Sequence, residues 1–253
     1  MVDEKELRAA PPVDIRAVGQ DSVSHSLAVI STVYHYNLWV FDCLRDYIGP
    51  RVLEVGAGVG TITQFLLNQE SVTCLEPFRT YYDYLSHRFR EHGNVHVYPL
   101  AIQETPSESV PAGQFDSAIC INVLEHIEDH VDALRRMRQL VRPGGRVIVF
   151  VPSLPIIYGD MDRAMGHYRR YTLRSLRRVF VEAGIRPRRG HYVNMVGALG
   201  WWWQGRFRKK ATLSESATRF FDRLVPFLSA AERIMRPFFG QSVLLVGSVD
   251  QDG

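Results

Sequence analysis

Three glycines and two acidic residues in the first third of the chain are spaced as a ligand-binding loop would require. Gly56, Gly58 and Gly60 follow a short apolar run that contains Glu54. Glycine lets a backbone turn sharply and lets a ligand lie against it without a Cβ in the way. Glu76 ends the next apolar run, about twenty residues later, where a carboxylate can accept both hydroxyls of a ribose. Because two features occur at matched spacing, the pair favours a binding site over an ordinary turn.

The glycine spacing distinguishes between ligands. A dinucleotide fold has GxGxxG, with a pyrophosphate over the start of the following helix. Here the pattern is ExGxGxG, from Glu54 to Gly60. It resembles motif I of the class I S-adenosylmethionine (SAM)-dependent methyltransferases. The resemblance implies SAM as the cofactor, bound through Glu54, Gly56, Ala57, Gly58, Gly60, Thr61, Glu76 and Pro77.

A second block resembles the same family. The apolar run Phe115–Ile121 predicts a buried strand and leads into the segment 122–128, which reads NVLEHIE. Ligands bind at the carboxyl edge of open α/β sheets, so this segment is expected beside the cofactor. The family pattern implies cofactor contacts at Asn122, Val123, Leu124 and Ile127, and adenine contacts at Leu100 and Ala101. His126 is either a general base or a structural histidine, and the sequence leaves both open.

The elements that would position these residues alternate between strands and helices. Strands are predicted from Arg51 to the glycine loop and at 71–76, 95–99, 115–121, 146–151, 188–195 and 241–249. Helices are predicted directly after the glycine loop, at 80–91, around Leu134–Leu140, and from an N-cap at Thr172 to Gly184. This order predicts an α/β fold with a doubly wound seven-stranded sheet, the Rossmann-like methyltransferase fold.

Two segments extend this predicted core. Residues 22–48 have helical periodicity and many aromatics, and the family resemblance implies a lid over the cofactor with Tyr36 and Trp39 as candidates. Residues 196–240 form an aromatic-rich insertion before the last strand, which we interpret as a helical substrate lid, a packing subdomain, or both. The predicted organisation is therefore a cap at 1–48, loosely attached at 1–14, a SAM-binding core at 49–195 plus 241–250, and the insertion at 196–240.

The distribution of charge predicts an anionic partner. Between Arg163 and Lys210 the chain has thirteen Arg or Lys residues against one acidic residue, Glu182. Arginine binds phosphate through two parallel hydrogen bonds. We therefore expect a small-molecule substrate with a phosphate or diphosphate on an apolar body, such as an isoprenoid diphosphate. The predicted substrate contacts are Tyr36, Tyr158, Arg169, Arg170, Tyr171 and Trp201, and His167 and Tyr168 are predicted as base or orienting groups. The competing interpretation is that Arg169 and Arg170 pair with Asp160, Asp162 or helix carbonyls.

Composition describes an ordinary globular protein. Hydrophobic residues are 46% and charged residues 23% of the 253, with a net charge of +3. Cys43, Cys74 and Cys120 lie in apolar runs without metal or disulfide spacing, so we predict buried thiols and no metal site. No signal peptide and no apolar run of about 18 residues is visible, which predicts a cytoplasmic protein, with peripheral membrane contact left open.

Three functions are compatible with these patterns. The first is methylation of a small molecule in secondary metabolism, either the anionic substrate above or, on oxygen or nitrogen, another natural-product, polysaccharide or lipid precursor. The second is nucleic-acid methylation, against which we find no appended RNA-binding module and no base-flipping motif. The third is a non-catalytic SAM-binding or protein-binding role. The substrate, the methylated atom and the oligomeric state stay open.

Overall fold

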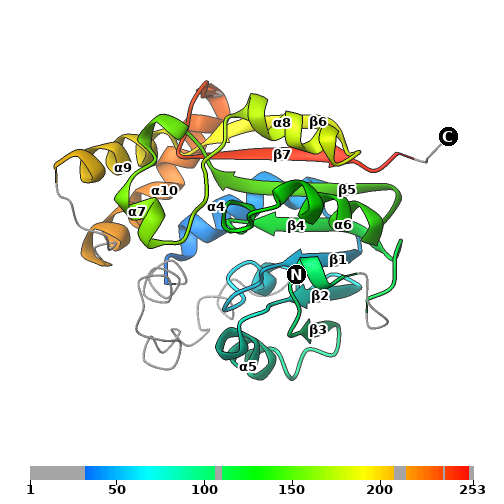
Figure 1. Ribbon diagram of the computed structural model, residues 1–253. Coiled ribbons are helices and arrows are strands. Elements are labelled where there is room, and N and C mark those ends of the chain that lie inside the picture. The colour runs from blue at the N-terminus through cyan, green and yellow to red at the C-terminus, as the bar shows by residue number, and fades with distance from the viewer. Residues whose placement is uncertain (1–31, 106–109, 208–214, 236, 251–253) are drawn as a thin grey trace.

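A single seven-stranded sheet forms the centre of the computed structural model, which describes residues 32–105, 110–207, 215–235 and 237–250 (Figure 1). The strand order is β3-β2-β1-β4-β5-β7-β6. Strands β1 to β5 pair in parallel, and β7 is antiparallel to both β5 and β6. The strands are β1 (Arg51–Val55), β2 (Ser71–Leu75), β3 (Val95–Tyr98), β4 (Phe115–Ile121), β5 (Val141–Pro152), β6 (Arg186–Val193) and β7 (Ser242–Ser248). The predicted doubly wound sheet is confirmed.

The central strands are apolar because helices cover both faces of the sheet. Four of the five residues in β1 and in β2 are buried, as expected of parallel strands. One face packs on α6 (His130–Leu140) and α8 (Leu173–Glu182). The other packs on α4 (Tyr34–Leu44), α5 (Arg79–Arg88) and α10 (Glu215–Met235). The remaining helices are α7 (Asp160–Ala164) and α9 (Met195–Phe207).

The strand order locates the binding crevice. From β1 the chain runs outward through β2 to β3, and it then returns to the other side of β1 as β4. The carboxyl ends of β1 and β4 therefore flank a topological switch point, where ligands bind in open α/β sheets. The glycine loop follows β1 and the 122–128 segment follows β4, so both predicted motifs meet there.

The helix expected directly after the glycine loop is absent, and this prediction was wrong. Only a short 3₁₀ helix, Thr63–Phe65, forms between β1 and β2. Its hydrogen bonds run three residues back, from the Phe65 N–H to Ile62 O and from the Leu66 N–H to Thr63 O. Three successive β-branched residues, 61–63, disfavour a regular helix, and Gly60 just before them has a positive φ of 79°. The backbone N–H groups at the crevice therefore belong to the loop and not to a helix end.

The described part of the insertion packs on the N-terminal helix. The Asp222 carboxylate of α10 accepts hydrogen bonds from the backbone N–H groups of Tyr36 and His35, at 2.8 and 3.4 Å. Val225 of α10 is buried in the same core cluster as Trp39. The predicted loosely attached segment 1–14 and residues 208–214 of the predicted insertion lie outside the described residues. Among the helices that the structure describes, none has the length and apolarity that a membrane span requires.

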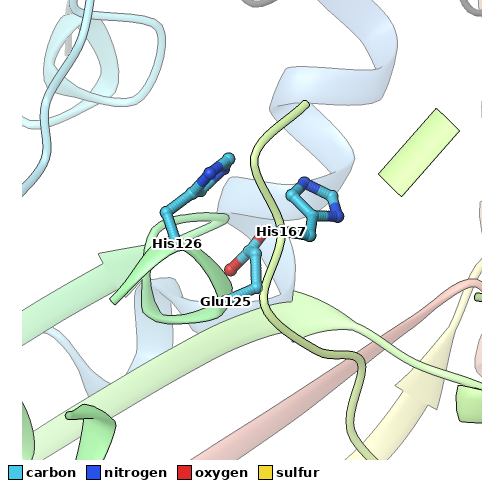
Figure 2. A group of neighbouring side chains, drawn as sticks. All are labelled: Glu125, His126 and His167. Carbon is cyan, nitrogen blue, oxygen red and sulfur yellow. The ribbon is translucent and has the colours of Figure 1, made fainter. Parts of the chain in front are cut away.

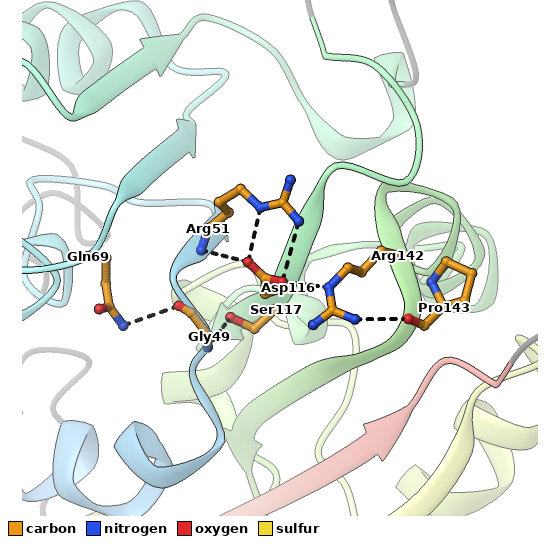
Figure 3. Close-up of polar contacts among 7 residues, drawn as sticks. All are labelled: Gly49, Arg51, Gln69, Asp116, Ser117, Arg142 and Pro143. Carbon is orange, nitrogen blue, oxygen red and sulfur yellow. Dashed lines mark hydrogen bonds and ion pairs between the residues drawn. The ribbon is translucent and has the colours of Figure 1, made fainter.

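The amino end of the sheet is held by a partly buried carboxylate between two arginines (Figure 3). Asp116 of β4 accepts hydrogen bonds from Nε and the backbone N–H of Arg51 in β1, at 3.1 and 3.0 Å. Its other oxygen accepts from Nε of Arg142 in β5. Gly49 packs so closely that an added Cβ would lie 2.4 Å from the Asp116 Cβ. The Arg51 hydrogen bonds, followed by the one from Arg142, lower the pKa of Asp116 to about 2. The carboxylate thus links three strands at the end of the sheet opposite the crevice.

We predict that Asp116→Asn lowers the free energy of unfolding by about 1 kcal/mol at pH 7, because charge-assisted hydrogen bonds to two partly exposed arginines are lost. A carboxylate whose pKa is lower in the folded protein contributes stability above its unfolded pKa near 4, and that contribution disappears as the pH falls through about 2. Urea unfolding at pH 7 and in acid measures both effects. Asp83→Asn, which removes an exposed ion pair with Arg79, is the control and should change little. Equal losses in the two variants would contradict the prediction.

Candidate functional site

A pocket of about 490 Å³ opens at the carboxyl ends of β1, β2 and β4. Its walls come from α4, the glycine loop, the start of α5, the segment after β4 and the segment after α7. The lining residues are Tyr36, Asn37, Val40, Glu54, Val55, Gly56, Ala57, Gly58, Val59, Thr61, Ile62, Glu76, Pro77, Phe78, Tyr81, Ile121, Asn122, Val123, His126, Met165, Gly166 and Tyr168. The pocket therefore gathers most of the predicted cofactor residues together with Tyr36, His126 and Tyr168.

Each of the three loop positions requires glycine for a different structural reason. All adopt positive φ, which only glycine tolerates well. A Cβ on Gly56 would lie 2.4 Å from Val123 Cγ2, so this glycine lets the two crevice segments touch. Gly60 does not line the pocket, and its Cβ would lie 2.4 Å from Phe89 Cε2 behind the loop. Gly58 lines the pocket and donates its N–H to Glu76.

Glu76 is the acidic group best placed to receive hydroxyls. It is 3% exposed and lines the pocket at the end of β2. One carboxylate oxygen accepts from the Gly58 N–H at 2.8 Å and the other from the Phe78 N–H at 3.0 Å. Burial raises the pKa of Glu76, and these two backbone N–H groups counteract the shift. Each oxygen keeps a further lone pair, so the carboxylate fits the two hydroxyls of a ribose.

Glu54 organises the loop from inside the strand. It is 4% exposed, and its Oε2 accepts a hydrogen bond from the Thr63 hydroxyl at 2.7 Å. The Cys74 thiol lies 3.8 Å from the same oxygen. Burial raises the pKa of Glu54 to about 7. The carboxyl therefore ties the segment after the glycine loop to β1 and β2 while it borders the pocket.

Two histidines and a glutamate lie close together beside the part of the pocket that His126 lines (Figure 2). Glu125 and His126 end a 3₁₀ turn after β4, whereas His167 follows α7. The two imidazole centroids are 4.7 Å apart, edge to face. Burial, and then the proximity of His167, lower the pKa of His126 to about 4, so its imidazole is neutral at pH 7. His126 and Tyr168 border the cavity, and the Tyr168 side chain is exposed.

The predicted substrate arginines are engaged elsewhere. The guanidinium of Arg170 is 1% exposed, donates from Nε to Asp162 at 2.7 Å and lies over the Trp201 ring. Arg169 donates to the backbone carbonyls of Ile127 and Glu128 at 2.8 and 2.9 Å. These are the contacts of the competing interpretation, with Asp162 and backbone carbonyls as the partners.

Two predicted substrate tyrosines also have internal partners. Tyr171 is 2% exposed, and its hydroxyl lies 2.8 Å from Nδ1 of His130. The hydroxyl of Tyr158 donates to the His167 backbone carbonyl at 2.7 Å. Of the predicted substrate residues, only Tyr36 lines the pocket.

Some predicted cofactor residues lie outside the lining of this cavity. Leu124 and Ile127 are buried in the core cluster under α6. Leu100 packs against that cluster, and Ala101 begins the next 3₁₀ turn. Conversely, Met165 and Gly166 line the pocket although no local pattern marks them, because the position of α7 brings them there.

Comparison with known proteins agrees with this geometry. Residues 53–147 match the family model described as a methyltransferase domain. The chain is 29% identical over 112 residues to the ubiquinone biosynthesis O-methyltransferase of Aeromonas salmonicida, a segment that spans 44% of this chain and 47% of that protein. It is 28% identical over 142 residues to the tRNA U34 carboxymethyltransferase of Shewanella baltica, covering 53% of this chain and 41% of that protein. The chain thus spans about half the length of these curated relatives.

A solved structure shares the fold over nearly the whole chain. The geranyl diphosphate C-methyltransferase of Streptomyces coelicolor, in complex with Mg2+, geranyl diphosphate and S-adenosyl-L-homocysteine, superimposes with a TM-score of 0.61 at 16% identity. The match covers 94% of this chain and 88% of that one. At this identity the likeness concerns the fold alone.

We predict that Glu54 makes the protein less stable as the pH rises from about 4.5 to 7. Its folded pKa of about 7 lies above the unfolded value, so over this window the folded state holds one proton more than the unfolded state. Glu54→Gln keeps an acceptor for Thr63 but has no proton to lose. Between pH 5 and pH 8 its stability relative to the wild type should therefore improve by about 1–3 kcal/mol.

Urea unfolding at several pH values measures this difference. Glu70→Gln, which removes a carboxyl at an exposed position, is the matched control. Parallel curves for Glu54→Gln and the wild type would contradict the assignment.

Proposed function

We propose, from the premise that this chain carries a class I SAM-dependent methyltransferase domain, that it transfers a methyl group from SAM to a small-molecule acceptor. The observation that carries this proposal is the shared pocket. It joins the bare backbone of the glycine loop and the buried carboxylate of Glu76 to the imidazole of His126 and the hydroxyl of Tyr168. One side is suited to the cofactor and the other to an acceptor.

The cofactor side fits SAM on three observations. Gly56 and Gly58 bring backbone without side chains to the pocket wall, and each Glu76 oxygen keeps a further lone pair beyond the N–H that it already accepts. Asn122 lines the pocket at the end of β4 with a positive φ of 52°. SAM supplies a methyl group that is already electrophilic, so the protein's part is to align the acceptor, exclude water and take up a proton where required.

His126 borders the pocket with an imidazole that is neutral at pH 7, because burial lowers its pKa. Tyr36 of α4 and Tyr168 after α7 both line the pocket. Because α10 holds α4 through Asp222, we propose that the N-terminal helix and the insertion act together as a lid over it.

The chemistry of the lining bears on the acceptor. No lysine or arginine is among the described residues that line the pocket, and its ionisable carboxyls are Glu54 and Glu76. Arg169 and Arg170, on which the prediction of a phosphate-bearing substrate depended, are occupied by internal partners. We therefore favour an uncharged acceptor with a nucleophilic oxygen, the kind of atom named for the ubiquinone biosynthesis relative. The isoprenoid diphosphate stays a prediction, and the shared fold with a geranyl diphosphate enzyme does not by itself support it.

A nucleic-acid acceptor has less support. Arg177, Arg188, Arg189 and Arg233 border a second cavity of about 810 Å³, which shares no described lining residue with the first. The basic surface is thus not part of the proposed methyl-transfer pocket. The likeness to a tRNA carboxymethyltransferase is the reason to include RNA among the substrates tested.

We predict that Glu76→Ala weakens SAM binding at least tenfold, because hydroxyls buried without an acceptor cost about 1–3 kcal/mol. Isothermal titration of the full-length protein with SAM measures the affinity. Glu70→Ala, an exposed glutamate in the turn before β2, is the control and should bind as the wild type does. An unaltered affinity in Glu76→Ala would refute the role of this residue.

Methyl transfer itself is tested with SAM carrying a labelled methyl group. Phenolic and hydroxylated acceptors, geranyl diphosphate and unmodified tRNA are incubated separately with the protein, and labelled products are identified by mass. We expect label in a hydroxylated acceptor. Label in geranyl diphosphate or tRNA alone would replace the proposed acceptor, and SAM binding without any turnover would favour a non-catalytic role.

A further inference from the structure

We propose that Glu125, His126 and His167 form a binding site for a divalent first-row transition metal ion, and that this ion holds the acceptor oxygen beside the SAM pocket. The metal site stands on the geometry of the three side chains. Its role toward the acceptor rests on the proposed function. The sequence predicted no metal site because it offered no ligand spacing, and two of these ligands are separated from the third by about forty residues.

The three side chains are a metal-ligand set by chemistry and by distance. Each offers one ligand atom, and these atoms all lie within 4.8 Å of one another. Two imidazoles and one carboxylate bind zinc in metalloproteases and Fe(II) in oxygenases, with coordination positions left open for substrate. Figure 2 shows the Glu125 carboxylate directed toward the gap between the two imidazole rings. The set therefore suits a catalytic rather than a closed structural site.

The His167 imidazole is held by a buried carboxylate through one ring nitrogen, which leaves the other nitrogen for a metal ion. Nδ1 of His167 lies 2.9 Å from Oδ1 of Asp162, and Asp162 is itself fully buried and held by Arg170 and by the Gly159 N–H. The His126 ring lies beside Gly166, where an added Cβ would be 3.8 Å from its Nδ1. Metal-ligating histidines characteristically donate their second N–H to a carboxylate or a backbone carbonyl, which fixes the tautomer and the ring orientation. The Asp162 contact gives His167 this support.

The carboxylate supplies a second, independent observation. Glu125 is 1% exposed, and its Oε2 has no hydrogen-bond partner among the described residues. A buried polar atom without a hydrogen-bond partner costs free energy. A metal ion that binds at this position is one explanation for such an atom. A cation bound between the imidazoles would provide the missing partner.

The distances require only a modest closure. With metal–ligand bonds of about 2.1 Å, ligand atoms in a tetrahedral site lie about 3.4 Å apart. The longest separation in the cluster is within 4.8 Å, so small side-chain rotations are sufficient.

The location gives the ion its role. His126 borders the SAM pocket, and Gly166 and Tyr168 next to His167 border it too. A bound cation lowers the pKa of a coordinated hydroxyl, so an acceptor O–H releases its proton to water near neutral pH. The oxygen lone pair then forms the O–C bond to the methyl group as the C–S bond breaks, and that electron pair returns to sulfur as a neutral thioether. A bound metal thus favours an oxygen acceptor, such as a phenol, over an alkene.

The test is metal binding by the full chain without an affinity tag. Isothermal titration with ZnCl2, and the visible absorption of the Co2+ form, report affinity, stoichiometry and coordination number. We expect one tight site in the wild type, and a loss of affinity of at least tenfold in both Glu125→Gln and His167→Gln. His87→Gln, which removes an exposed histidine on α5, is the control and should bind as the wild type does.

Several outcomes overturn the proposal. The first is that Glu125→Gln and His167→Gln bind zinc as tightly as the wild type does. The second is that they lose no more zinc affinity than the control His87→Gln. The third is that the Co2+ form shows the spectrum of a fully hydrated six-coordinate ion. Thermal unfolding and SAM titration establish that each variant is folded, and if Glu125→Gln does not fold, His167→Gln decides the matter. Methyl transfer that continues after removal of the metal would overturn the role assigned to the ion.

The metal site and the proposed function fail separately. SAM binding and turnover without metal binding would refute this site alone. Zinc binding by a protein that does not bind SAM would refute the methyltransferase function and leave the site.

Discussion

The hydrogen bond from the Gly58 N–H to Glu76 is the contact on which the cofactor half of the pocket depends. It joins the turn after β1 to the end of β2, and it fixes the carboxylate at the pocket wall. Glu54 secures the same loop from behind through Thr63. Two buried carboxyls, one facing the ligand and one facing the loop, therefore replace the helix N-terminus that holds a pyrophosphate in dinucleotide folds. This arrangement suits a ligand with hydroxyls and a charged amino-acid group.

A second junction, at Asp162, organises the acceptor half. Its carboxylate is hydrogen-bonded to the His167 ring, the Arg170 guanidinium and the Gly159 N–H. This buried group therefore fixes the path of the chain from α7 to the Ser153–Tyr171 bridge beside β5. Arg170 compensates the buried negative charge, which is why this arginine is part of the scaffold and not of the substrate site. Asp162 thereby couples the orientation of His167 to the folding of the whole segment.

The insertion before β7 and the core are also joined by carboxylate contacts. Glu232 of α10 accepts from the backbone N–H groups of Asn194 and Met195, where β6 gives way to α9. Asp222 of the same helix accepts from the start of α4. Helix α10 thus places one carboxylate at the start of α4 and another at the start of α9, where partial positive charge gathers. Segments from opposite ends of the chain are joined in this way.

The sequence by itself determined the features that local patterns encode. Apolar runs predicted the strands, Thr172 the start of α8, and the spacing of Glu54, the glycines and Glu76 the place of the crevice, because residues at the ends of adjacent parallel strands must meet. Only the tertiary structure decided which partner each side chain finds. Gly60 makes room for Phe89, Arg169 and Arg170 bind internal acceptors, and Glu125 and His126 meet His167. A residue type fixes what a side chain can bind, but its actual neighbours depend on how segments distant in sequence pack against one another.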